Sequence, residues 1–572
     1  MLWKRGRQAP GTWRRTIGLL PVYIGFVLLK LWLVASQPIL AIGGAANDDG
    51  LFLNLANSLS KGQWLGTYNV LTLTKGCFYS IWITLVSRLS IPLLLSQHLL
   101  YLAAVAAFVL AIRPALPRPK LLLLLFALLW FNPGSYCGHV LRIMREGIYP
   151  ALTLLVVAGT VGILVRLEGP VKHSLRWMLG TGVVFAAFWQ TREEGVWLLP
   201  CYAVVMAWAV VKLWRNHHPR KWWLALMCFI PLVMVMSGNL VVSGINRAKY
   251  GVFASVEFKA DDFLSAYGSL SRVKPKPWQS HVLVTKETRE RIYAVSPAFA
   301  QLRPLLEGAL GRGWSNAGGT RWPSKNSEIG GGWFMWALRD AVARAGYHSS
   351  GKKAMAYYRR LADEIDAACA DGRLECFPAR ASMMAPWRRE FNEPFVEAMA
   401  KAVPFLASFT DISATPSPSM GSDASLGLYR ELTHNRIAPV PPVPNNWLGG
   451  KVNAFKIDTL NAILAVYQKI MPILAVLALA AFFLRMILGL KCRRLSNSWI
   501  VQTALLGSIV VRLTILSIIE VTSFPGIDPL YLSSAYPLLI AFIFLAMQEN
   551  ALVALRFLGT ATKIIPKREA GA

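Results

Sequence analysis

Long apolar runs restrict this chain more than any other feature of its sequence. A helix of about 18 to 20 apolar residues crosses the ~30 Å of hydrocarbon in a bilayer, and hydrophobic residues make up 55% of this 572-residue chain. The mean hydropathy of +0.43 exceeds what a soluble core requires. The sequence therefore predicts an all-α polytopic membrane protein. Its ten predicted spans cover approximately residues 16–41, 92–112, 120–132, 147–166, 176–190, 196–214, 222–245, 463–488, 499–519 and 530–548.

Lysine and arginine collect in alternate connections between these spans. Basic loops stay on the cytoplasmic side of a membrane, so both termini are predicted to be cytoplasmic. The other connections carry acids and are predicted to lie outside. The basic segments are MLWKRGRQAPGTWRR, RPALPRPK, RLEGPVKHSLR, KLWRNHHPRK, LKCRR and TKIIPKR, and the outer acids are Asp48, Asp49, Glu146, Glu193, Glu194, Glu520 and Asp528.

One connection is long enough to be a domain. Residues 246–462 form this predicted outer domain, between an N-terminal membrane module, 1–245, and a C-terminal module with a basic tail, 463–572. The N-terminal module contains the first outer loop, residues 43–91. Within the outer domain, SSGKKAMAYYRRLADEIDAACADG begins with serine caps, keeps a periodic apolar face and stops at Gly372, which predicts a mostly helical domain. This domain lacks an Asn-X-Ser/Thr sequon, which favours a bacterial inner membrane with the domain in the periplasm.

Two cysteines of the outer domain lie close together in sequence. Cys369 and Cys376 stand in CADGRLEC, with the turn-forming Gly372 between them. An oxidising outer compartment permits a disulfide between them, whereas nearby thiols also remain reduced in many proteins. The sequence leaves both states open.

The net charge of +30 raises the question of nucleic-acid binding. Much of the excess lies in the predicted cytoplasmic connections, where topology and anionic lipid headgroups explain it. We therefore exclude nucleic acid as a partner and expect contact with membrane lipids. Cations in the outer turns have no such explanation, and they lie close to acids, which predicts a site that handles an anion and a proton together. These cations are Lys75, Arg142, Arg145 and Arg192.

Two adjacent acids, Asp48 and Asp49, precede the short amphipathic stretch GLFLNLANSL of the first outer loop. Either acid can cap the helix that this stretch predicts, and Gly62 can end it. One acid is enough for a cap, while a second adds like-charge repulsion and a desolvation cost at a membrane surface. The pair is therefore predicted to have a functional role, with capping as the alternative.

Two further outer turns combine arginine with glutamate at the start of an apolar run. They are LRIMREGIYPAL, which contains Glu146, and WQTREEGVWLLP, which contains Glu194. Taken singly, each turn is equally consistent with an interfacial anchor or an ordinary ion pair. Together with the acidic pair, they favour a shared site.

These segments, in this order, resemble the GT-C superfamily of polytopic glycosyltransferases, which includes protein O-mannosyltransferases and the lipid A aminoarabinose transferase. The resemblance rests on NDDGLFLNLANSLSKGQW, on TKGCFYSIW, and on TREEGVWLLP, where Glu193 replaces the proline of a TRPEG-like turn. It also rests on DPLYLSSAYPLLIAF, where Leu530 stands in place of a common arginine. It covers roughly residues 15–245 and 463–550, and the outer domain matches no family that we can name.

The resemblance implies transfer of a sugar from a polyprenyl-phosphate donor to a glycan, lipid or protein acceptor at the outer face. By position, Asp48 is the base that takes the acceptor's proton, and Asp49 supports it. The outer cations Lys75, Arg142, Arg145 and Arg192 would hold the donor phosphate. Supporting roles fall to Glu146, Glu194, Tyr531 and Tyr536. Mg²⁺ or Mn²⁺ at Asp48 and Asp49 stays open, because the superfamily includes members with and without metals.

Two other classes of function remain as alternatives. A transporter or flippase of a lipid-linked or anionic substrate would place ionisable groups within the membrane, and Lys30 and Arg512 fall within predicted spans, although the sequence shows no internal repeat. A non-catalytic scaffold would use the tryptophans of the outer domain to stack on sugars, or simply to fill its core.

Overall fold

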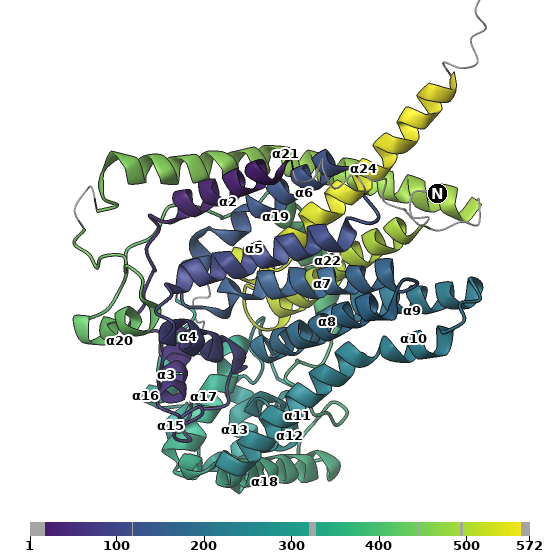
Figure 1. Cartoon of the computed structure of the whole chain (residues 1–572). Coiled ribbons are helices and arrows are strands. Elements are labelled where there is room, and N and C mark those ends of the chain that lie inside the picture. The colour runs from purple at the N-terminus through teal and green to yellow at the C-terminus, as the bar shows by residue number, and fades with distance from the viewer. Residues whose placement is uncertain (1–17, 117, 320–327, 444–446, 492–495, 562–572) are drawn as a thin grey trace, which may run out of the picture.

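The computed structural model describes residues 18–116, 118–319, 328–443, 447–491 and 496–561. In these ranges the regular secondary structure is helical, apart from isolated β-bridges. Helices of the two predicted membrane modules run side by side in one bundle (Figure 1). The basic segment before the first span and most of the basic tail, residues 1–17 and 562–572, lie outside the described residues.

Among the described residues, six helical segments are long and apolar enough to cross a membrane. All six coincide with predicted spans. They are α5 (Leu93–Ile112), α7 (Tyr149–Arg166), η4 with α9 (Gly195–Arg215), α10 with α11 (Lys221–Tyr250), α21 (Gly450–Lys491) and α22 (Asn497–Thr522).

The other four predicted spans also correspond to helices, but within the described residues none of these helices alone is long and apolar enough to count as a span. Helix α6 and the segment after it, Pro133–Val140, make a pair bent by 56° that counts as a seventh span if it crosses as one unit. The structure thus supports six or seven spans, and the count of ten stays a prediction. The four helices are α2 (Leu20–Val34), α6 (Pro119–Trp130), α8 (Val171–Thr191) and α24 (Tyr536–Ala561).

The surface of the bundle agrees with a membrane environment. Large apolar side chains on α11 and α21 are exposed, with Met236 65% and Val476 67% exposed. A soluble protein rarely leaves such a contiguous apolar surface in water. Both faces therefore fit contact with lipid.

The first outer loop folds into two short helices at one end of the bundle. Helix α3 (Asp49–Ser60) begins at the acidic pair, and α4 (Phe78–Arg88) follows the lysine motif. Both helices lie beside the teal helices of the outer domain (Figure 1). The loop is thus enclosed between the two parts of the protein.

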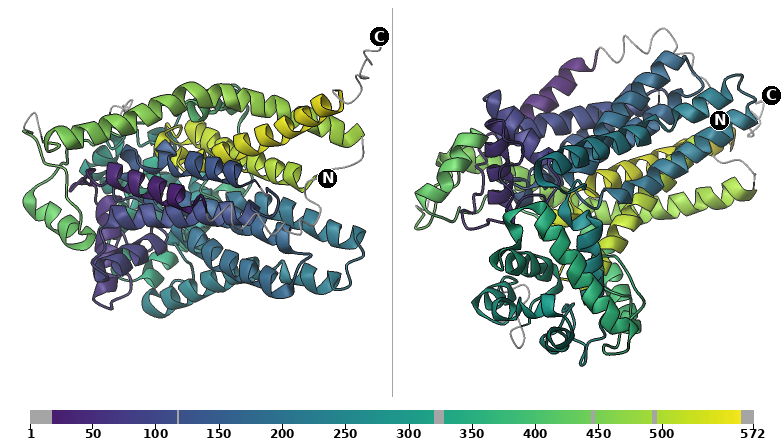
Figure 2. Two further views of the ribbon diagram at one scale, coloured as in Figure 1. Left: turned by 45° about the horizontal axis from the view of Figure 1, so that its top comes forward. Right: turned by 90° about the horizontal axis from the view of Figure 1, so that it is seen from below.

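The outer domain is built from helices that follow α11 in the chain. Helices α12 and α18 pack against each other, and the chain then leads into α21, a 42-residue helix that begins at Gly450, well before the predicted span. Figure 2 shows this domain against one side of the bundle. Its helices of ten or more residues are α12 (Asp261–Arg272), α13 (Lys286–Val295), α17 (Gly331–Arg344), α18 (Gly351–Ala370), α19 (Asn392–Ala407) and α20 (Asp423–Thr433).

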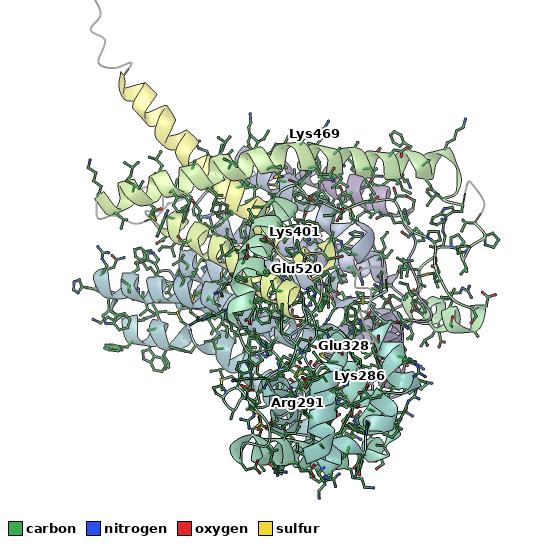
Figure 3. All side chains as sticks on the ribbon, turned by 180° about the vertical axis from the view of Figure 1, so that it is seen from behind. Lys286, Arg291, Glu328, Lys401, Lys469 and Glu520 are labelled. Atoms are coloured by element: carbon green, nitrogen blue, oxygen red, sulfur yellow. A yellow bond between two sulfur atoms is a disulfide. The ribbon has the colours of Figure 1, made fainter. Side chains whose placement is uncertain are left out.

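Contacts between the outer domain and the C-terminal module involve both charged and aromatic groups. Helix α19 packs on α22, and Lys401 of α19 lies 3.4 Å from Glu520 of α22 (Figure 3). Phe409, just after α19, stacks on Tyr536 with ring centroids 4.6 Å apart. The domain is therefore integrated with the bundle over more than one helix.

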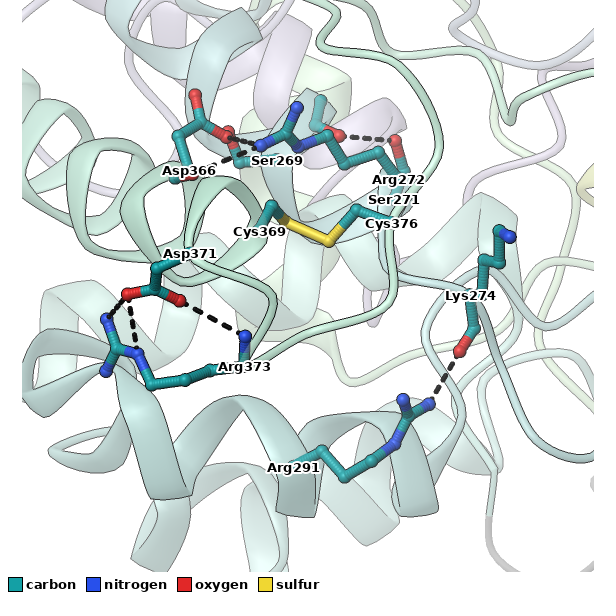
Figure 4. Close-up of a disulfide and its surroundings, with 11 residues drawn as sticks. Ser269, Ser271, Arg272, Lys274, Arg291, Asp366, Cys369, Asp371, Arg373 and Cys376 are labelled. Carbon is teal, nitrogen blue, oxygen red and sulfur yellow. Dashed lines mark hydrogen bonds and ion pairs between the residues drawn. A yellow bond between two sulfur atoms is a disulfide. The ribbon is translucent and has the colours of Figure 1, made fainter.

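Cys369 and Cys376 form a disulfide in the structure, with Cα atoms 5.7 Å apart (Figure 4). Helix α18 ends at Ala370, and Gly372 adopts a positive φ of 80° in the turn that follows, a conformation that glycine tolerates without steric cost. Cys376 also forms a β-bridge with Val273. The disulfide ties the end of α18 to the segment that follows it, and the β-bridge connects that segment to the residue after α12.

Candidate functional site

Charged side chains from four separate segments meet at the end of the bundle that carries the first outer loop. The segments are this loop, the turn before α7, the turn after α8, and α22. We call the group the charged cluster. It consists of the cations Lys75, Arg142, Arg145, Arg192 and Arg512 and the carboxylates Asp48, Asp49, Glu146, Glu193 and Glu194.

Asp48 is the most exposed carboxylate of the cluster, and it pairs with the largely buried Lys75. Lys75 Nζ lies 2.5 Å from Asp48 Oδ1, and the Asp48 side chain is 46% exposed, more than any other carboxylate of the cluster. Partial burial acts to raise the pKa of Asp48, but the charge of Lys75 and, more weakly, of Arg142 and Arg145 brings this pKa below its usual value. Asp48 is therefore ionised at neutral pH and can accept a proton.

Asp49 occupies a different environment although it is the next residue. Its side chain is completely buried, paired with Arg142, and its Oδ1 accepts a hydrogen bond from the backbone N–H of Ile143 at 3.2 Å. Burial raises the pKa of Asp49, and the charge of Arg142 opposes that shift. Asp49 thus fixes the turn before α7 against α3 and is closed to a substrate.

Capping does not account for either acid. Asp48 stands at the N-cap position of α3, but its side chain makes no capping hydrogen bond. The Asp49 carboxylate is directed to Arg142 and to Ile143 instead. The capping alternative is therefore wrong for the side chains of this pair.

Glu193, which departs from the TRPEG-like pattern, joins two outer segments. Its carboxylate lies 2.6 Å from Arg145 and accepts a hydrogen bond of 2.9 Å from the backbone N–H of Gly76. A Cβ atom on Gly76 would approach the carbonyl oxygen of Gln190 to 2.1 Å. Glycine at this position lets the first outer loop lie against the turn after α8, directly beside Lys75.

The innermost part of the cluster is a chain of alternating charges. Arg192 pairs with the buried Glu146 and lies 3.2 Å from Glu194, which lies 3.1 Å from Arg512. Arg512, fully buried, also donates to the carbonyl oxygen of Tyr531 at 2.8 and 3.0 Å. Burial would raise the pKa of Glu194, but the charges of Arg192 and Arg512 lower this pKa to about 2.

The two predicted supporting tyrosines lie in different places. The Tyr531 ring is 5.5 Å from the Arg192 guanidinium and so borders the charged cluster. Tyr536 stacks on Phe409, and its hydroxyl has no hydrogen-bond partner in the described part of the chain. The structure therefore does not bring Tyr536 into the cluster.

Sequence reasoning missed two cations of this site. Arg512 was interpreted only as an intramembrane charge, although a buried arginine requires a partner and the outer glutamates were available. Lys259, in η5 (Glu257–Lys259) of the outer domain, lies 5.6 Å from the ring of Trp189. Burial lowers the pKa of Lys259, and the charges of Glu193 and Glu194 partly raise it again. No sequence pattern marks Lys259.

Lys259 differs from the cluster cations in its pairing. Each cation of the charged cluster lies within ion-pair distance of a carboxylate. Within the ranges that the structure describes, Lys259 has no such carboxylate. The five cations and five carboxylates of the cluster match in number, and Lys259 is a further cation within the electrostatic reach of Glu193 and Glu194.

The residues proposed for a metal do not form a metal-binding set. Asp48 and Asp49 are each paired with a different cation. No group of three or more His, Cys, Asp or Glu side chains is placed to hold a metal ion within the residues described. We therefore derive no step through Mg²⁺ or Mn²⁺.

Comparisons with known proteins give little further information. No protein-family model matches the sequence, and no curated protein matches it. Among solved structures, the chain is similar to ArnT from Cupriavidus metallidurans in the apo state, with 15% identity and a TM-score of 0.31. It is also similar to the same protein bound to undecaprenyl phosphate, with 13% identity and a TM-score of 0.30. Each match covers 92% of this chain and 77% of the other. Both scores are too low to establish a common fold or activity.

Proposed function

We propose that this protein is a membrane glycosyltransferase. It moves a sugar from a polyprenyl-phosphate donor to a hydroxyl of a glycan, lipid or protein acceptor, at the membrane face that carries the charged cluster. The observation that supports this proposal best is the Asp48–Lys75 pair, because a partly exposed, ionised carboxylate lies 2.5 Å from a cation. Transfer of a sugar from phosphate needs a base for the acceptor hydroxyl and a cation for the leaving phosphate, and this pair offers one of each.

The reaction assigns a role to each group. The acceptor oxygen attacks the anomeric carbon of the sugar while Asp48 takes the hydroxyl proton. The bond between the anomeric carbon and the phosphate oxygen breaks, and its electron pair leaves with the polyprenyl phosphate. Negative charge therefore grows on the phosphate, where Lys75 and Lys259 stabilise it. The remaining cations hold the turns in place through their carboxylate partners.

Donor binding also prepares the base. When the donor phosphate attracts Lys75, the Asp48 carboxylate loses part of the positive charge that lowers its pKa. A less stabilised carboxylate accepts a proton more readily. The pairing in the unliganded protein thus keeps Asp48 ionised and weakly basic until donor is present.

The two cations within predicted spans do not favour a transport pathway. Lys30 donates to the carbonyl oxygen of Trp130 at 2.6 Å and to the hydroxyl of Ser135 at 2.7 Å, and it lies 4.2 Å from the Trp130 ring. Arg512 belongs to the charged cluster. Both charges have internal partners that join helices, which is a structural role.

The test is turnover of a polyprenyl-phosphate-linked sugar by purified protein, measured with thermal stability. Asp48→Asn should fold with only the small loss of stability expected when a half-exposed ion pair is removed, and it should reduce transfer by about two to four orders of magnitude, the usual contribution of a general base. Asp423→Asn is the matched control, because Asp423 is 94% exposed and also paired with an arginine. Full activity of an Asp48→Asn, Asp49→Asn double variant would contradict the proposal and would favour a scaffold or transporter.

A further inference from the structure

A buried ion pair within the outer domain contacts the first outer loop. It consists of Arg339, in α17, and Glu257, in η5, and both side chains are completely buried. We call these two residues the anchor pair. Neither belongs to the charged cluster, and neither was singled out from the sequence.

Most contacts of the anchor pair with the loop are made to the backbone of the loop. Arg339 donates from Nε and Nη2 to the carbonyl oxygen of Val70, at 3.1 and 2.8 Å, and from Nη2 to that of Thr72 at 3.2 Å. The backbone N–H of Glu257 donates to the carbonyl oxygen of Leu73 at 2.7 Å. These contacts fix the path of the chain and do not depend on the loop's side chains.

One side-chain contact completes the attachment. The Tyr68 hydroxyl donates to Glu257 Oε2 at 2.8 Å. Leu73 has a positive φ of 60°, a left-handed conformation that a side chain rarely adopts without support. The anchor pair supplies that support immediately before Lys75.

Helix α17 also reaches Lys75 more directly. Lys75 Nζ is 5.9 Å from the ring of Trp336, one turn before Arg339 on α17, and 5.1 Å from the ring of Phe52. Only 9% of the Lys75 side chain is exposed. The outer domain thus forms one wall around the cation that pairs with Asp48.

We infer that the anchor pair is a positioning device through which the outer domain holds residues 68–73 so that Lys75 reaches Asp48. The inference rests on the proposed function for its catalytic consequence. It gives the outer domain a part in donor binding. Arg339 and Glu257 form no hydrogen bond or ion pair with Asp48 or Lys75, so they act through their contacts with residues 68–73 of the loop.

A test that does not need activity uses the chemical reactivity of Lys75. In the full-length purified protein, an amine-acylating reagent should modify wild-type Lys75 slowly, since this lysine is ion-paired and nearly inaccessible. Arg339→Met should raise the acylation rate at Lys75, measured by mass spectrometry, by about tenfold, the size of coupling found within shared networks. An unchanged rate at Lys75 in a folded variant overturns the inference.

Two further variants separate positioning from a general loss of packing. Arg289→Met is the matched control, because Arg289 is also a buried outer-domain arginine, 2.6 Å from Glu307, and within the described residues it forms no hydrogen bond or ion pair with the first outer loop. Arg289→Met should lower the melting temperature without changing the acylation rate at Lys75. Tyr68→Phe removes one hydrogen bond to the anchor pair. If Arg339→Met does not fold, the acylation rate at Lys75 is measured in Tyr68→Phe instead.

A double-mutant cycle tests the catalytic consequence. If Arg339 acts through Lys75, Arg339→Met should reduce transfer about tenfold in the wild-type background and little further in a Lys75→Ala background. Arg339→Lys should restore part of the loss, because it keeps the charge. Equal losses in both backgrounds overturn the inference. Absence of transfer by wild-type protein refutes the proposed function instead, and the acylation rates then decide the positioning role by themselves.

Discussion

Glu194 and Arg512 are separated by 318 positions in the sequence and lie 3.1 Å apart. Glu194 belongs to the turn after α8, and Arg512 lies in α22. The pair therefore joins the N-terminal and C-terminal membrane modules directly at the charged cluster. Its integrity should affect both the stability of the bundle and the geometry of the site.

We expect Glu194→Gln to destabilise the protein because it leaves Arg512 fully buried without its carboxylate. Removing one partner of a buried pair costs about 3 to 5 kcal/mol, and we expect the lower end because Glu194 is 31% exposed. The double variant Glu194→Gln, Arg512→Met should recover part of the loss. Thermal unfolding of the purified variants checks this, and additive losses would show that the pair is not coupled.

The pH dependence of transfer should follow the ionisation of Asp48. Its pKa is lowered in the folded protein, so activity that requires the carboxylate should persist as pH falls below the usual value of about 3.9 for aspartate. Replacing Lys75 by Met removes the main charge that lowers this pKa, while burial still raises it. The acid limb of kcat/KM should therefore move to higher pH in Lys75→Met. If the acid limb does not shift, Asp48 is not the group whose ionisation sets it.

The pairing with Lys75 also determines how the contribution of Asp48 to folding stability changes with pH. Because its folded pKa lies below its unfolded pKa, Asp48 stabilises the protein above the unfolded value, and this contribution disappears as pH falls through the folded pKa. The effect should be absent in Asp48→Asn. Comparing the melting temperatures of the two proteins between pH 7 and acidic pH separates this contribution from that of other carboxylates.

Lys259→Ala should weaken donor binding more than it slows the chemical step. Lys259 is a further cation within the electrostatic reach of Glu193 and Glu194, so its loss should raise KM for the donor by about tenfold, as expected for one charge-assisted contact. Lys259→Arg should retain much of the affinity. Lys274, which pairs with Glu375 on the surface, is the matched control. Steady-state kinetics with varied donor concentration distinguish an effect on donor binding from an effect on the chemical step. An unchanged KM in Lys259→Ala would show that Lys259 is not part of the donor site.

Gly76→Ala should disturb the site without changing any charge. The added Cβ would lie 2.1 Å from the carbonyl oxygen of Gln190, so the first outer loop must move away from the turn after α8. Overpacking against the backbone typically costs about 1 to 3 kcal/mol. Gly427→Ala, where nothing lies within 4 Å of the added atom, should be nearly neutral. Equal stability and activity of the two variants would mean that this close approach is unimportant.

Mass spectrometry without reduction should find Cys369 joined to Cys376. Replacing both by serine should cost about 2 to 3 kcal/mol, because the bridge closes only a short loop. The loss should be confined to the outer domain, since neither cysteine contacts the charged cluster. Free thiols at both positions in protein from the native membrane would contradict this prediction.

Several features of this protein follow from local sequence alone. Apolar runs predicted the helical bundle because a backbone in lipid must satisfy its own hydrogen bonds. The predicted outer position of cations beside acids also singled out Lys75, Arg142, Arg145 and Arg192. These inferences need only composition, periodicity and the expectation that a charge near lipid has a partner.

The partners themselves were decided by tertiary structure. Asp48 and Asp49 are adjacent and chemically identical, yet one is half exposed beside Lys75 and the other is completely buried beside Arg142. Burial and neighbouring charge come from the fold, and they give the two carboxylates opposite pKa shifts.

The same reason explains why the outer domain could not be connected to the site from sequence. Lys259, Glu257 and Arg339 carry no recognisable motif, and Arg339 acts on the backbone of Val70, 269 positions away. Any residue has the same carbonyl oxygen, so sequence contains no signal for this contact. Local sequence predicted the helical segments, of which six among the described residues are long and apolar enough to cross a membrane, whereas long-range packing decided which charges meet, because electrostatic interactions depend on distance in space and not along the chain.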